Sequence, residues 1–179
     1  MRKDTRFLHE GDVNFCYSDE SGTGQEPIAT MVGILVDSTR MHLTKTEWVD
    51  FLAALSAMTG RTISELHTAD FYAGNGVWRG LSAELRTKAI SLVLDWLTER
   101  KHHVIYTSVL KTQFFEAVQK RQLPAELNTP YRFMAFHLVL AVQKYSQPEK
   151  GTKGNTALVF DNEERERLRL SDIVLNPPS

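Results

Sequence analysis

Apolar residues in this chain follow two patterns, strict alternation and helical spacing. From Val13 to Ser18 apolar and polar residues alternate, which predicts a β-strand with two different faces. The nearly continuous apolar run 28–36 predicts a second strand, buried on both faces and paired with the first through the turn that contains Gly22 and Gly24. Two later apolar runs predict further strands, at 103–110 and 156–160.

Helical spacing predicts the segments between the strands. Thr44 and Glu47 match the T-x-x-E pattern of a capping box, and Gly60 suits the end of the helix that follows. Ser82 is expected to cap a second helix that runs to about Arg100. The remaining helices are expected at about 112–121, at 130–145 after a Thr-Pro start, and in the charged segment 163–167.

The order of these elements predicts an α/β fold in which a mixed sheet is flanked by helices. The chain has 179 residues, which suits a domain that buries about 70% of the surface of its unfolded chain. We therefore expect a single domain over residues 1–179. Trp48 is expected in the core, and Arg61–Gly80 is expected to be a surface loop of the kind that often holds functional groups.

Composition and charge limit the class of protein. No apolar stretch approaches the roughly 20 residues of a membrane helix, and no secretory signal follows the N-terminus, so we expect a soluble cytoplasmic protein with no membrane partner. The net charge of −1 gives no overall attraction to nucleic acid, so such contacts would have to come from local patches. The single cysteine, Cys16, cannot form an intrachain disulfide and is expected to be a small core residue.

The segment from Tyr17 to Gly22 places two acids where the first strand ends. If the strand continues that far, its alternation puts Asp19 and Glu20 on opposite sides of the sheet. Only one of them can then point into a given cleft, and we select Asp19, which lies on the side of Tyr17. The alternative is that Asp-Glu-Ser-Gly-Thr-Gly only builds a hairpin turn, because Asp, Ser and Gly each favour turns.

The last predicted strand also ends in an aspartate, Asp161. If the first and last strands are parallel neighbours, Asp19 and Asp161 meet, and close carboxylates repel unless a divalent cation or a shared proton compensates. Hard oxygen ligands favour Mg²⁺ or Mn²⁺, and such ions support phosphoryl transfer. The third expected ligand is Glu65, and Asp70, Glu163 and Glu164 are the alternatives.

Several short motifs resemble one known family. They are Tyr-x-Asp-Glu-Ser-Gly at 17–22, Gly-Ile-Leu-Val at 33–36, Glu-Leu-His at 65–67, Lys111 after the third strand, and Leu-Val-Phe-Asp at 158–161. Together they resemble the large bacterial and phage family that is catalogued as a domain of unknown function with an RNase H-like fold. The resemblance spans nearly the whole chain, and its first motif is the specific one. It implies an RNase H-like mixed sheet flanked by helices.

The resemblance also implies a nuclease-type or integrase-type site. In that site Asp19, Glu65 and Asp161 are the catalytic residues and bind Mg²⁺ or Mn²⁺, and the substrate is DNA or RNA, in connection with phage defence or mobile elements. Members of the family continue past the Asn-Pro-Pro segment into a helix that supplies another aspartate, so we expect the domain to need a further C-terminal element. Accessory roles are expected for Glu20, Ser21, His67, Lys111 and Glu164, and Lys111 is either near the scissile phosphate or simply solvated.

Other interpretations stay open. His67, His102 and His103 suggest zinc, but the last two point to opposite sides of an extended strand, and His67 is more simply a neighbour of Glu65. A haloacid-dehalogenase-like phosphatase needs a second aspartate where Ser21 stands, and Ser21 lacks the G-x-S-x-G pattern of a nucleophile. The main alternative is a catalytically silent RNase H-like scaffold or interaction module.

Overall fold

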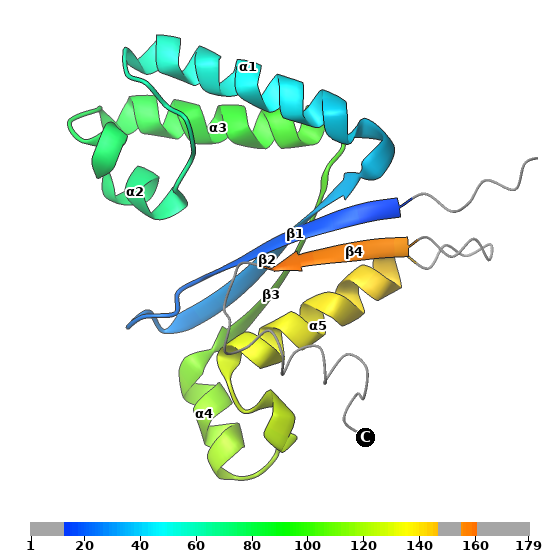
Figure 1. The fold of residues 1–179 in the computed structure, drawn as a ribbon. Coiled ribbons are helices and arrows are strands. Elements are labelled where there is room, and N and C mark those ends of the chain that lie inside the picture. The colour runs from blue at the N-terminus through cyan, green and yellow to red at the C-terminus, as the bar shows by residue number, and fades with distance from the viewer. Residues whose placement is uncertain (1–12, 147–154, 161–179) are drawn as a thin grey trace, which may run out of the picture. The chain divides into compact units, whose positions relative to one another are not determined.

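A four-stranded mixed sheet is the centre of unit 1, the first of two compact units in the chain (Figure 1). The structure is a computed structural model, and it describes residues 13–146 and 155–160. Unit 1 contains the described residues up to Ser38 and those from His103 onward, and unit 2 is Thr39–His102. Each unit has a hydrophobic core of its own.

The sheet has the strand order β3-β2-β1-β4. Its strands are β1 (Val13–Ser21), β2 (Ile28–Asp37), β3 (His103–Leu110) and β4 (Asn155–Phe160). The pairs β1–β2 and β2–β3 are antiparallel, whereas β1 and β4 are parallel. The four predicted strands and the α/β fold class, a mixed sheet flanked by helices, are therefore confirmed.

One long helix, α5 (Pro130–Tyr145), packs along one face of this sheet (Figure 1). It begins where the Thr-Pro pattern predicts, because the Thr129 hydroxyl accepts a hydrogen bond from the Arg132 N–H. Two shorter helices precede it, α4 (Lys111–Gln119) and the 3₁₀ turn η3 (Ala125–Leu127).

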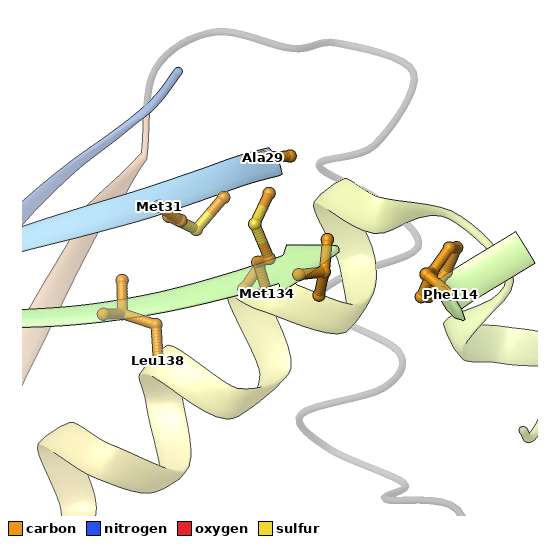
Figure 2. Close-up of a cluster of buried hydrophobic side chains, with 7 residues drawn as sticks. Ala29, Met31, Phe114, Met134 and Leu138 are labelled. Atoms are coloured by element: carbon orange, nitrogen blue, oxygen red, sulfur yellow. The ribbon is translucent and has the colours of Figure 1, made fainter. Parts of the chain in front are cut away.

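The core of unit 1 lies between α5 and the sheet. Figure 2 shows Met134 and Leu138 of α5 beside Met31 of β2, and all three are essentially inaccessible to solvent. Along β2 the side chains on this face are buried, whereas those on the other face are mostly half-exposed. The prediction that β2 is buried on both faces is therefore wrong for the described residues, because α5 covers one side only.

Unit 2 is helical. Its elements are α1 (Met41–Thr59), α2 (Thr68–Ala73), the 3₁₀ turn η2 (Gly76–Trp78) and α3 (Ala83–Glu99), and the turn η1 (Ser38–Arg40) leads into α1. The Ser82 hydroxyl accepts a hydrogen bond from the Leu85 N–H, which confirms the predicted cap of α3. Gly60 ends α1 in the left-handed conformation, with φ 67°, also as predicted.

The predicted capping box of α1 is wrong. The helix begins at Met41, so Thr44 is already inside it, and the side chain of the N-cap residue Arg40 makes no capping hydrogen bond. Glu47 instead forms an ion pair with Arg100, the residue that follows α3. A contact between distant residues therefore takes the carboxylate that the local pattern assigned to the cap.

The segment 61–80 is also different from its prediction. It contains α2 and η2, and it supplies three buried residues of the core of unit 2, Ile63, Phe71 and Trp78. Trp78 is 1% exposed, whereas Trp48 is half-buried at the side of this core. The fully buried tryptophan of unit 2 is therefore Trp78 and not Trp48.

No helix in the described part of the chain is long and apolar enough to cross a membrane.

Candidate functional site

The strand β1 presents its two acids on opposite faces. It continues through Ser21, so the alternation holds as far as the acidic pair. Cys16 and Ser18 are buried on the α5 side, and Glu20 lies on that same side, whereas Asp19 is exposed. The predicted separation of Asp19 from Glu20 is confirmed.

We call the face that carries Asp19 the Asp19 face. The register of the strands arranges its side chains in cross-strand rows, each with one residue from β1, β2 and β3. The three rows nearest to Asp19 are Ser21–Thr30–Ser108, Asp19–Val32–Tyr106 and Tyr17–Ile34–Val104. The acid therefore lies between a row of hydroxyls and a row that is aromatic and aliphatic.

The Asp19 carboxylate is open to solvent. Its Oδ1 accepts a hydrogen bond from the Glu20 N–H at 2.9 Å, which fixes the carboxylate to the backbone of its own strand. Along the described strand residues, Asp19 is the one charged side chain on its face. A phosphodiester that approached this face without a cation would therefore meet only negative charge.

The parallel partner of β1 ends at the same level of the sheet. Ser18 lies opposite Phe160, the last described residue of β4, and the Ser18 hydroxyl donates a hydrogen bond to the Val159 carbonyl at 3.0 Å. The prediction that the first and last strands are parallel neighbours is thus confirmed. Asp161 itself follows Phe160 and lies outside the described residues, so its meeting with Asp19 stays a prediction.

A cavity of about 360 Å³ lies on the other side of β1. It is lined by Glu20 from β1, by Lys111 and Phe115 from α4, and by Thr129 and Tyr131 at the start of α5. Lys111 Nζ donates a hydrogen bond to the Gly24 carbonyl at 2.8 Å, so this lysine is anchored to the β1–β2 turn. The structure therefore brings two of the accessory residues, Glu20 and Lys111, to one cavity within the size range of ligand pockets.

The other predicted residues in the described chain belong to unit 2. Glu65 precedes α2, and its carboxylate contacts His67 Nε2 at 3.0 Å, with both side chains largely exposed. The expectation that His67 is a neighbour of Glu65 is confirmed. Asp70 lies within α2. Because Glu65 and Asp70 are in unit 2 and Asp19 is in unit 1, their role as ligands beside Asp19 stays a prediction.

Among the residues that the structure describes, no group of three or more His, Cys, Asp or Glu side chains is arranged to hold a metal ion. The described part thus offers no zinc site built from His67, His102 and His103. Glu163 and Glu164 lie outside the described residues, as Asp161 does. On the Asp19 face the described donors are hard oxygens of one carboxylate and the neighbouring hydroxyls, which suit Mg²⁺ or Mn²⁺ in kind but require further carboxylates.

Sequence reasoning missed the partners of Asp19 on β2 and β3. Tyr106 lies in the same cross-strand row as the acid and Ser108 in the next row, although both are far from it in sequence. The alternation in 103–110 signals that they share one face, but the register that aligns this face with Asp19 is a tertiary property.

Comparisons of this chain with protein-family models, with curated proteins and with solved structures find no match. The resemblance of its motifs to the RNase H-like family therefore remains a prediction.

Proposed function

We propose that this chain is a divalent-metal-dependent nuclease with an RNase H-like fold, or a related phosphoryl-transfer enzyme, in which Asp19 and Asp161 hold the metal. The first-strand motif supports the assignment, as does a mixed sheet whose fourth strand runs parallel to the first.

The single observation that carries the proposal is the pairing of Ser18 with Phe160 in the parallel pair β1–β4. Asp19 and Asp161 are the next residues of the two strands. Neighbouring strands lie about 4.8 Å apart, so continuing the pair by one residue would bring both carboxylates within reach of one cation. The strand pairing alone would then place two acids from distant parts of the chain side by side.

In this proposal Asp19 and Asp161 hold Mg²⁺ or Mn²⁺, and Glu65, Glu163 or Glu164 completes the carboxylate set. A cation held there would supply charge neutralisation for the phosphate and would lower the pKa of the attacking water. The water oxygen would form a bond to phosphorus as the bond to the leaving sugar oxygen breaks, and the proton released by the water would be replaced, through solvent, by the proton that the leaving oxygen takes up. Asp19 contributes an exposed carboxylate whose orientation is set by its hydrogen bond to the Glu20 N–H.

A second candidate is a catalytically silent scaffold of the same fold. One observation favours it: the described residues hold no metal-binding group of three or more ligands. In that case Asp19 is an isolated surface acid, and substitution of Asp19 leaves every activity of the protein unchanged.

Cleavage assays separate the two candidates. The chain, and in parallel the chain extended at its C-terminus, is incubated with single- and double-stranded DNA and RNA in Mg²⁺ or Mn²⁺, with EDTA blanks. The proposal expects cleavage that Asp19→Asn and Asp161→Asn each abolish, and that Asp50→Asn, an exposed acid on α1, leaves intact. Equal signals from the wild type and from both active-site variants would support the scaffold.

A further inference from the structure

Tyr106 lies in the same cross-strand row as Asp19, on the same face of the sheet, and its side chain is 69% exposed. Val32 lies between them on β2, so the two backbones are about 10 Å apart at the usual strand spacing. Among the described residues, the Tyr106 ring contacts no other ring and its hydroxyl has no hydrogen-bond partner. A flat, polarizable surface is therefore exposed beside the acid.

The next row towards the end of β1 carries three hydroxyl groups. They belong to Ser21, Thr30 and Ser108, and within the described chain none of these side chains has a hydrogen-bond partner. Hydroxyl groups are common donors to phosphate oxygens, and they bring no charge of their own. With a cation at Asp19, this row and the acid would together form a neutral-to-positive strip suited to a phosphate backbone.

We infer that the Asp19 face binds one unpaired nucleic-acid strand, and that a base beside the scissile phosphate stacks on Tyr106. The inference rests on the proposed nuclease function and adds a substrate class to it. The hydroxyl row holds the neighbouring phosphate, so the bound nucleic-acid strand passes from the Asp19 row to the hydroxyl row. Tyr106 is thus a substrate-binding residue.

The preference for an unpaired strand follows from geometry. A ring that projects from an open sheet can meet the face of a base only when that base is free of its partner strand, because paired bases are stacked on each other. Stacking tolerates every base, so this contact selects single strands without selecting a sequence.

Binding assays test the role of Tyr106 apart from cleavage. Three fluorescein-labelled oligonucleotides are each titrated with the whole chain: single-stranded DNA, single-stranded RNA and a duplex. Ca²⁺ replaces Mg²⁺ to suppress turnover. We expect Tyr106→Ala to weaken single-strand binding between about 5-fold and about 150-fold, and Tyr106→Phe to retain it. The matched control is Tyr72→Ala, because Tyr72 is 72% exposed but lies in unit 2, and it should bind as the wild type does.

A second variant gives a direct readout of stacking. All three tryptophans of the chain lie in unit 2, so Tyr106→Trp adds the first indole to unit 1. Adding the unlabelled single strand should quench the extra fluorescence of Tyr106→Trp relative to the wild type, and the duplex should quench it less. Circular dichroism checks that each variant is folded.

The outcomes separate this inference from the proposed function. If Asp19→Asn abolishes cleavage while Tyr106→Ala binds single strands like the wild type, the nuclease stands and the stacking role is overturned. If the wild type neither binds nor cleaves, the proposed function fails and this inference fails with it. A large loss of folding stability in both Tyr106→Ala and Tyr106→Phe would show that another part of the protein covers the ring, and would also overturn the inference.

Discussion

The Ser18 hydroxyl donates a hydrogen bond to the Val159 carbonyl across the parallel strand pair β1–β4. Ser18 is 7% exposed and the bond is partly buried, so it links β4 to the sheet with limited access of water. Ser18→Ala should therefore lower the free energy of unfolding by about 1 kcal/mol. Urea unfolding followed by far-ultraviolet circular dichroism measures the change. Ser108→Ala, at an exposed strand position, is the control and should cost less.

Gly33 leaves room for Cys16. A Cβ added at Gly33 would lie 2.8 Å from the Cys16 Sγ and 3.4 Å from two methyl carbons of Leu138. Those neighbours are fully buried, so Gly33→Ala should destabilise unit 1 by about 1–3 kcal/mol. Gly24→Ala is the matched control, because the nearest atom there is the end of the flexible Glu26 side chain. Equal unfolding midpoints for the two variants would contradict this packing.

Burial also controls the chemistry of Cys16. Desolvation by burial raises the pKa of its thiol above the ordinary value of 9.0, so the reactive thiolate is scarce in the folded protein. Ellman's reagent should therefore label Cys16 slowly in the native state and quickly in urea. Rapid labelling of the native protein would show that this part of the core is open.

The same shift predicts a dependence of stability on pH. Since the pKa of the folded thiol is raised, its contribution to stability is complete below pH 9.0 and is lost as pH rises from there towards the folded pKa. The difference in unfolding free energy between the wild type and Cys16→Ala should therefore shrink as the pH rises above 9.0. A constant difference would contradict the raised pKa.

Arg86 holds the end of α2 in unit 2. Its Nη1 donates hydrogen bonds to the carbonyls of Phe71 and Tyr72, at 3.3 and 2.9 Å, where the helix has no partners of its own for these groups. Arg86→Ala should lower the stability of unit 2 by about 1–3 kcal/mol. Tryptophan fluorescence in urea measures it, since all three tryptophans lie in this unit. Arg79→Ala, at an exposed arginine, should have little effect.

Local patterns predicted the elements that depend on local chemistry. The alternation at 13–18, the cap at Ser82 and the stop at Gly60 each concern a few neighbouring residues, and each is confirmed. The start of α1 and the burial of Trp78 depend on contacts between distant residues, such as the pair formed by Glu47 and Arg100. Those contacts leave no signature in a short stretch of sequence.

The candidate site likewise has features that follow from local sequence and features that depend on tertiary structure. The opposite directions of Asp19 and Glu20 follow from the period of a strand, and they were predictable. The position of Tyr106 beside Asp19 depends on the registers of two strand pairs, and the cavity shared by Glu20 and Lys111 depends on how α4 and α5 meet the sheet. Neither relationship follows from residue type or spacing.

The central claim is that Asp19 and Asp161 hold one divalent cation together. Calorimetric titration of Mn²⁺ into the wild type, Asp19→Asn, Asp161→Asn and the double variant tests it most directly. The account predicts that either single substitution removes nearly all of the binding and that the double variant loses little more, because the two carboxylates share one ion. Without metal, Asp19→Asn should be as stable as the wild type or slightly more stable, since the substitution relieves repulsion between like charges. Mn²⁺ binding that survives both substitutions, or losses that simply add, would contradict the shared site.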